Sequence, residues 1–359
     1  MNQTSNAYLA AALAGLLAPA AIAGTSATSD VATPVTLAAQ PDKPTPASPA
    51  PRTKVSTQIF INASDLQRSG VTRDDEGLAL ELKRFYINVD HTFNENWSGH
   101  LTTDVQWLRN SDPTDLLFRH AYLERRLGKS QHLQLGNAPT PWILHVAKLN
   151  GFRYVDPGVI PRMKLGVPAD WGVQVGGDVG HFNYQVAAVT GAGFQKPRVG
   201  ERADIEARVS WKPVKQFEAA IGGYHGTRAM DVDKPHLHTA ERWNAMATWI
   251  DKEFRVGAEF FYADNWTRVT QVSPDAARGW SGWGSYQLTP AFAAFARHDR
   301  TDMSLRLDPS REERFSQFGL EWKQSKHVKL ALVGKRTEVA SSKVNATANE
   351  AGIWGQMVF

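Results

Sequence analysis

The residues best suited to chemistry in this chain are cationic, and many of them gather in one segment. The segment 137–170 carries one histidine and four cations: His145, Lys148, Arg153, Arg162 and Lys164. Its only carboxylates are those of Asp156 and Asp170. Because rings of Lys and Arg side chains favour anions, the segment is predicted to bind or steer anions. The alternative is that each cation pairs with a carboxylate elsewhere in the chain.

Catalytic and metal-dependent chemistry finds little support in the sequence. There is no cysteine, which excludes thiol catalysis and Cys-based metal sites. The eleven histidines are scattered, and PHLH (235–238) holds two of them without an apparent third metal ligand. An enzyme built into a membrane barrel would need a Ser or Asp nucleophile beside a His. We therefore predict no catalytic residue, no metal and no cofactor, and keep a barrel enzyme as an alternative.

Hydrophobic periodicity indicates the elements that position these residues. In WSGHLTTDVQW (97–107), Trp97, Leu101, Val105 and Trp107 share one face and polar side chains take the other. Such alternation predicts strands with one dry and one wet face. Ten residues separate the two tryptophans, about 33 Å along a strand. Tilted by about 40°, this distance gives about 25 Å of height, the apolar band of a transmembrane β-barrel.

The same pattern recurs along the chain and predicts sixteen strands. They cover 55–64, 81–93, 97–109, 116–127, 131–136, 170–179, 181–190, 202–213, 216–227, 238–250, 253–265, 276–287, 290–302, 311–323, 327–339 and 349–359. The connections alternate between short turns, such as 251–252, and longer loops, which is typical of an outer-membrane barrel. We therefore predict an all-β, 16-stranded antiparallel transmembrane β-barrel. A soluble β-sheet binding module, in which core aromatics also alternate, is a second alternative.

The third long loop, 137–169, is too long and too apolar to extend into water. It includes Trp142, Leu149, Phe152 and Tyr154 among other apolar residues. Long loops in compact folds usually have a function. We expect this loop to fold into the lumen and narrow it.

Strand parity assigns charged side chains to the lumen wall in equal numbers. The basic residues are Arg84, Arg208, Arg242, Arg255, Arg297, Lys329 and Lys335. The acidic residues are Asp90, Asp104, Glu206, Glu218, Glu259, Asp299 and Glu321. Strand 116–127 resists assignment, because parity places Arg119 and Arg125 opposite Glu124. A charge at the lipid midplane costs about 2–4 kcal/mol, so one assignment is wrong or the charges lie near an interface.

The N-terminal region indicates export. Residues 1–23 form a predicted signal peptide, whose apolar run ends in the small-x-small sequence Ala21-Ile22-Ala23. Residues 24–54 are rich in Pro, Ala, Ser and Thr and predict a disordered periplasmic linker, because each proline removes a hydrogen-bond donor. The barrel is then expected at 55–359. The net charge of +4 is too balanced to indicate nucleic acid binding.

The stretch LLFRHAYLERRLGKSQHLQLGNAPTPWI (116–143) resembles the phosphate-selective porin O/P family of Gram-negative outer membranes. FEAAIGGYHG and FAAFARHDRTD also resemble barrel strands of that family. The resemblance implies a sixteen-stranded, trimeric porin with an inward-folded third loop and an anion preference. It also implies phosphate binding by an arginine ladder and a lysine cluster, which do not match this sequence residue by residue.

These observations together predict a porin of the bacterial outer membrane. It would pass small solutes by diffusion, with a preference for anions such as phosphate set by the basic loop. Its partners would be outer-membrane lipid, two further copies of the chain and the assembly machinery, with no nucleic acid. The chain ends AGIWGQMVF, and Phe359 is predicted to act as the assembly signal on a closing strand.

Overall fold

The computed structural model describes residues 51–359 except 72, 74, 110–115 and 196–197. The predicted signal peptide, 1–23, and the predicted linker up to residue 50 lie outside the described residues. The first strand begins at Arg52, three residues before the expected start of the barrel.

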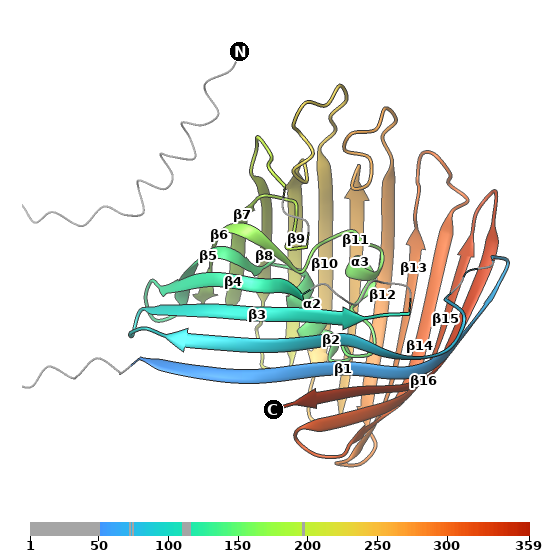
Figure 1. The fold of residues 1–359 in the computed structure, drawn as a ribbon, viewed down its shortest axis with the longest axis horizontal. Coiled ribbons are helices and arrows are strands. Elements are labelled where there is room, and N and C mark those ends of the chain that lie inside the picture. Colours follow the sequence, from blue (N-terminus) through green and yellow to red (C-terminus); the bar gives the residue numbers. More distant parts are fainter. Residues whose placement is uncertain (1–50, 72, 74, 110–115, 196–197) are drawn as a thin grey trace, which may run out of the picture. The chain divides into compact units, whose positions relative to one another are not determined.

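Sixteen antiparallel strands form a closed barrel, as the sequence pattern predicts (Figure 1). The strands are β1 (Arg52–Ser69), β2 (Gly77–Thr92), β3 (Trp97–Trp107), β4 (Leu116–Arg126), β5 (Gln131–Pro139), β6 (Ala169–Val179), β7 (Phe182–Val189), β8 (Asp204–Trp211), β9 (Phe217–Gly226), β10 (Ala240–Ile250), β11 (Phe254–Asp264), β12 (Ala276–Gln287), β13 (Phe292–Asp302), β14 (Glu312–Lys323), β15 (Val328–Ala340) and β16 (Asn345–Val358). Each strand pairs with its neighbours in sequence.

The first and last strands close the ring. β1 pairs with β16 from Gln58 opposite Val358 to Ser69 opposite Thr347. The final residue, Phe359, continues this ladder, because Thr57 N donates to its carbonyl at 2.6 Å and its own N donates to Thr57 O at 3.2 Å. Closure leaves no free strand edge, which is the condition for a sheet to lie in lipid.

The outer surface carries the apolar residues that the alternation predicts. Aromatic side chains near the short turns are exposed, and these include Phe93, Trp211, Trp249, Tyr286 and Trp322. Others lie further along the outer face, at Trp107, Trp171, Trp243 and Trp280, and are hereafter the upper aromatic row. Two aromatic rows flanking an apolar band are typical of a membrane barrel. Among the described residues, no helix is long and apolar enough to span a bilayer.

A β-bulge explains the strand that parity could not assign. The register between β3 and β4 shifts where Thr102 pairs with His120 but Thr103 pairs with Phe118, which leaves Arg119 as the extra residue. Phe118 is exposed on the outer face, whereas Arg119 is buried at 3% exposure on the inner side. Simple parity therefore fails for Arg119, which accounts for the conflict in strand 116–127, because a bulge lets two successive side chains point the same way.

The polar groups of this bulge are satisfied from the neighbouring strand. Asn137 on β5 is fully buried, and its Nδ2 donates to the carbonyls of Phe118 and Arg119 at 3.0 and 3.1 Å. A buried carbonyl without a partner would cost about 1–3 kcal/mol, so Asn137 stabilises the bulged conformation. A second irregularity lies in β2, where the pairing with β1 passes from Arg84 to Leu82 and skips Lys83.

The segment between β5 and β6, residues 140–168, is hereafter loop L3. It contains two short helices, α2 (Ile143–Asn150) and α3 (Val159–Arg162), which the sequence pattern did not predict. Its apolar side chains pack on an inner wall that is itself apolar at Tyr224, Met246 and Phe261. Burial of matching apolar surfaces explains why this loop leaves water.

Candidate functional site

Hydrogen bonds fix both ends of loop L3. Thr140 Oγ1 donates to Val167 O at 2.6 Å, and Thr140 N donates to Pro168 O at 3.1 Å. From the wall, Arg208 Nε donates to Pro141 O at 2.8 Å and Arg242 Nη1 donates to Leu165 O at 2.6 Å. These bonds fix where the loop leaves and rejoins the strands.

Polar contacts of L3 reach strands far apart in the ring. Trp142 Nε1 donates to Glu259 on β11 at 2.5 Å, and His145 Nε2 lies 2.6 Å from Glu218 on β9. At the other end of the loop, Arg153 Nη2 donates to Tyr86 OH on β2 at 2.8 Å. Because β2 lies far from β9 and β11 in the closed order of strands, L3 crosses the interior of the ring (Figure 1).

The tip of L3 is held by packing and by an ion pair. Phe152, Tyr154 and Val155 belong to a buried cluster with Phe60 and Trp354. Asp156 lies 2.5 Å from Arg297 Nη1. Burial alone would raise the pKa of Asp156, but the charges of Arg297, Lys335 and Arg162 hold that pKa below its usual range. The Asp156 carboxylate therefore stays ionised and anchored at neutral pH.

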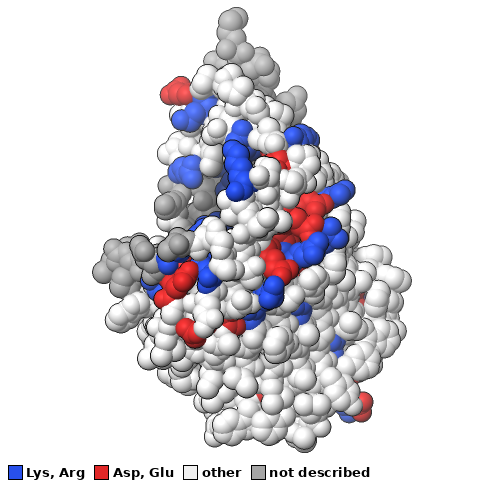
Figure 2. Space-filling model, turned by 90° about the vertical axis from the view of Figure 1, so that its right-hand side faces the viewer, with Lys and Arg blue, Asp and Glu red and all other residues white. Residues whose placement is uncertain are grey.

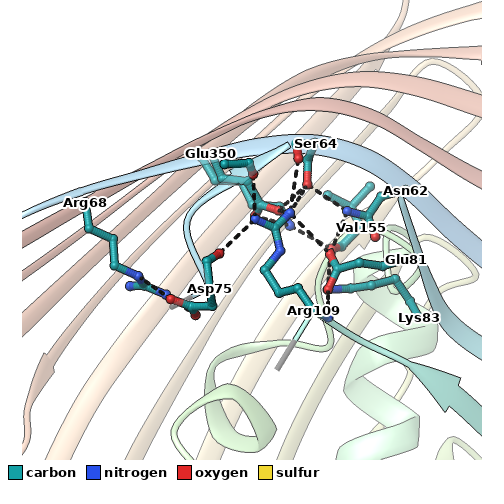
Figure 3. Close-up of polar contacts among 11 residues, drawn as sticks. Asn62, Ser64, Arg68, Asp75, Glu81, Lys83, Arg109, Val155 and Glu350 are labelled. Atoms are coloured by element: carbon teal, nitrogen blue, oxygen red, sulfur yellow. Dashed lines mark hydrogen bonds and ion pairs between the residues drawn. The ribbon is translucent and has the colours of Figure 1, made fainter. Parts of the chain in front are cut away.

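A polar network continues from this tip across the seam of the barrel (Figure 3). Lys335 Nζ donates to Val155 O at 3.1 Å and lies 3.4 Å from Glu350 on β16. Glu350 accepts from Ser64 on β1 at 2.7 Å, and Ser64 Oγ accepts from Arg109 at 2.9 Å. The closing strands and the loop tip are thus coupled through one set of hydrogen bonds.

On one side of L3 lies a cavity of about 210 Å³ lined by four cations. They are Lys83 and Arg84 from β2, Arg119 from β4 and Arg153 from L3. Among the described residues that line it there is no carboxylate. The cavity therefore concentrates positive charge beside the loop, which is the arrangement that stabilises an anion.

The cations of this cavity are held by two carboxylates and one aromatic ring, and the first carboxylate is Glu81, whose Oε2 lies 3.8 Å from Lys83 Nζ. Asp104 Oδ2 accepts from Arg84 at 2.7 Å and from Arg119 at 3.3 Å, and Asp104 itself is fully buried. The guanidinium carbons of Arg119 and Arg153 lie 5.3 and 5.5 Å from the centre of the Tyr86 ring. Cation–π contacts and the two carboxylates position the four cations without neutralising all of them.

A second cavity, of about 270 Å³, lies between L3 and the short turns. Its lining includes five cations, Lys148, Lys252, Arg255, Lys323 and Lys329, and three carboxylates, Asp251, Glu253 and Glu321. Gly151 ends α2 with φ of +88°, and a Cβ there would lie 1.5 Å from Arg255 Nη1. Glycine at this position therefore lets the loop backbone approach Arg255.

The remaining predicted cations mostly contact carboxylates or backbone oxygens. Arg162 Nη2 lies 3.1 Å from Asp299, Arg242 Nη2 lies 2.8 Å from Glu206, and Arg297 pairs with Asp156 and Asp299. Besides Pro141 O, Arg208 donates to Asn183 and Ser210. Lys164 is exposed, and its carbonyl accepts from Trp266 Nε1 at 3.0 Å.

Of the predicted site residues, the structure therefore brings Arg84 and Arg153 together in the first cavity and Lys148 and Arg255 together in the second. Sequence reasoning missed Lys83 and Arg119, because β-irregularities turn both into the lumen. The signal that could have found them was the presence of basic residues on both faces of one strand.

Solved structures of the same architecture include outer-membrane porins. The anion-selective porin from Comamonas acidovorans matches with a TM-score of 0.61 at 10% sequence identity, over 86% of this chain and 100% of that chain. The barrel has the fold of an outer-membrane porin. OmpT, an outer membrane protein of Vibrio cholerae, matches this porin fold with a TM-score of 0.61 at 12% identity, over 88% of this chain and 100% of that chain.

A third match is OprB of Pseudomonas putida, with a TM-score of 0.59 at 11% identity, over 86% of this chain and 94% of that chain. No protein-family model and no curated protein sequence matches the chain. Identities this low establish the fold alone, so the case for function rests on the residues.

Proposed function

We propose that the protein is an outer-membrane porin that passes small solutes by diffusion and prefers anions. The observation that carries this proposal is the cavity beside L3, whose described lining contains Lys83, Arg84, Arg119 and Arg153 and no carboxylate, while Asp104 and Glu81 behind the lining offset only part of this charge. A closed barrel with a loop across its interior needs no chemical step to move a solute.

Passage through such a channel depends on charge and hydration. An anion approaching the loop would exchange part of its water shell for guanidinium and ammonium donors in the first cavity. The second cavity, with its excess of cations around Lys148 and Arg255, would receive the anion on the short-turn side. Because each cavity contains more than one cation, an anion can pass from one cation to the next, and binding can remain weak enough for release.

The cations are proposed to divide into two groups. Arg84 and Arg153, with Lys83 and Arg119, would contact the permeating anion in the first cavity, and Lys148 and Arg255 in the second. His145, Arg162, Arg208, Arg242 and Arg297 would instead hold L3 against the wall, because their partners are loop or wall oxygens. Lys164, exposed on the loop, would contribute only to the surrounding field.

Phosphate is the anion that we propose the first cavity prefers. Arg84 and Arg119 converge on the same Asp104 oxygen, so their outer donors lie close enough to serve one oxyanion. Arg side chains match tetrahedral oxyanions by donating several hydrogen bonds at once.

The porin role also implies a location and partners. A signal peptide at 1–23, a periplasmic linker at 24–54 and a Phe359 assembly signal would direct the chain to the bacterial outer membrane. We propose a homotrimer, supported by the matching OmpT of Vibrio cholerae, which was solved in a trimer form.

Planar-bilayer recording of the refolded protein tests this proposal. Stepwise conductance in a KCl gradient, with a reversal potential directed toward chloride, is expected. Added phosphate should reduce the chloride current. Absence of conductance would contradict the porin role, cation selectivity would contradict the anion preference, and undiminished chloride current would contradict phosphate binding.

A further inference from the structure

The outer face of β12–β15 carries a band of charged side chains at the end of the barrel near the long loops. Figure 2 shows the side on which β13–β15 lie in Figure 1, where basic and acidic side chains gather above a nearly uncharged surface. The band consists of Arg278, Arg300, Arg314 and Arg336 with Asp302, Glu312 and Glu338. All seven lie on the outer side by strand alternation, where a membrane barrel meets lipid.

The charges in this band are unevenly paired. Arg278 Nε lies 2.8 Å from Asp302, and Arg336 Nη2 lies 2.6 Å from Glu338, so each of these arginines has its own carboxylate. By contrast, Glu312 accepts from both Arg300, at 2.8 Å, and Arg314. Arg300 and Arg314 therefore share one negative charge and carry a net positive charge of one.

The two arginines also lie directly opposite each other. Arg300 on β13 is the cross-strand partner of Arg314 on β14. Like charges in this position repel and destabilise a sheet. Their side chains are 50% and 53% exposed, so donors remain available beyond Glu312. On its other side Arg314 faces Glu338, which is bonded to Arg336. The outward donors that remain on Arg300 and Arg314 suit the binding of an external anion.

The residues around Arg300 and Arg314 indicate what kind of molecule would carry that anion. Trp280 is the partner of Arg300 on its other side, which places the arginines at the level of the upper aromatic row. On the outer face, between these arginines and the short turns, Phe318 and Leu332 are 67% and 65% exposed. Arg314 and Phe318 are four residues apart on the same face, about 13 Å along the strand. A charged site above an exposed apolar surface matches an amphiphile with an anionic head.

We propose that Arg300 and Arg314 bind the phosphate group of a membrane lipid in the leaflet on the long-loop side. The two guanidiniums would donate to the phosphate oxygens, and the acyl chains would lie along Phe318, Leu320 and Leu332. This site is independent of the lumen and does not rest on the proposed anion preference of the channel.

Native mass spectrometry of the detergent-solubilised full chain tests the proposal. The protein is incubated in mixed micelles with phosphatidic acid or with phosphatidylcholine, and the lipid retained per barrel is measured. Retention of phosphatidic acid in excess of phosphatidylcholine is expected. The double variant R300Q/R314Q should weaken that retention about tenfold or more, because it removes charge-assisted hydrogen bonds. Glu312→Gln should strengthen it, since it removes the only carboxylate that the pair shares.

The variant R278Q serves as the control, because it removes an outward arginine that is paired with Asp302. It is expected to retain the lipid, and heat-modifiable migration on a gel checks that every variant is folded. Equal retention by the folded R300Q/R314Q variant would overturn the proposal. So would full displacement of the lipid by inorganic phosphate, which would assign the site to a free anion. Loss of oligomer mass in R300Q/R314Q with unchanged lipid retention would instead assign the face to contact between copies.

Discussion

Arg84 and Arg119, which come from different strands, both donate to one oxygen of Asp104, at 2.7 and 3.3 Å. Asp104 is fully buried, and Arg119 is exposed by only 3%. This relationship determines the electrostatics of the first cavity, because one carboxylate supports two guanidiniums there.

Asp104→Asn should destabilise the barrel while increasing the positive field beside L3. Breaking a buried ion pair by removing one partner typically costs about 3–5 kcal/mol, because the remaining charges are left without compensation. We expect the urea midpoint of unfolding in micelles to fall accordingly. Asp90→Asn is the control, since the Asp90 side chain is half exposed and its ion-pair partner is His100. Equal stability of the two variants would contradict the role given to Asp104.

Asn137→Leu should disturb the bulge that turns Arg119 inward. The substitution keeps the branching of the side chain at Cγ but removes both donors to the carbonyls of Phe118 and Arg119. A loss of about 1–3 kcal/mol is expected from the unpaired carbonyls. The channel should also lose part of its anion selectivity as Arg119 moves. Leu135→Ala on the lipid face of the same strand controls for general weakening of β5. Unchanged stability and selectivity in Asn137→Leu would show that the bulge does not depend on this side chain.

The anchoring of the L3 tip should depend on pH only in acid. Because the pKa of Asp156 is held below its ordinary value, its ion pair stabilises the tip at any pH above the unfolded pKa of about 3.9. That stabilisation is lost as the pH falls through the lower, folded value. Single-channel conductance should therefore be steady from neutral pH down to about 5 and become unstable below about 4.

The variant Asp156→Asn should show the acid behaviour already at neutral pH. Glu95→Gln, in an exposed short turn, should behave as the unmodified protein does. Steady conductance of the Asp156→Asn channel at neutral pH would contradict the anchoring role of Asp156, as would acid instability of the unmodified protein that the substitution leaves unchanged.

Deletion of Phe359 should impair assembly more than selectivity. The residue lies at the seam, bonded to Thr57, and its side chain is 66% exposed on the outside. We expect the yield of folded, heat-modifiable protein in outer membranes to fall several-fold, while barrels that do form keep their reversal potential. Normal yield with altered selectivity would refute the assembly role.

The strands were predictable because their signal is local. Period-two alternation and the order of short and long connections depend only on residues close together in the sequence. All sixteen strands were therefore located from the sequence. The bulge at Arg119 was not, because one extra residue changes the face of a side chain without changing the composition of its strand. The basic residues on both faces of 116–127 indicated a conflict, but not its solution.

The division of the lumen charges was beyond the sequence for a different reason. Seven basic and seven acidic wall residues suggested a neutral interior. The closed ring places Glu206 beside Arg242 and Asp299 beside Arg297, and leaves four cations and no carboxylate among the described residues that line the first cavity. Which charges neutralise each other depends on the register between neighbouring strands and on the course of L3 through the barrel. Strand parity predicts neither of these.

The central claim is that the cations of the first cavity set an anion preference. Its most direct test is the reversal potential of the double variant K83Q/R84Q in a planar bilayer under a KCl gradient. Arg278→Gln, which removes one positive charge from the outer face, is the control. We predict that K83Q/R84Q shifts the reversal potential toward the value for potassium while Arg278→Gln leaves it unchanged. A K83Q/R84Q channel that remains as anion-selective as the unmodified protein would contradict the claim.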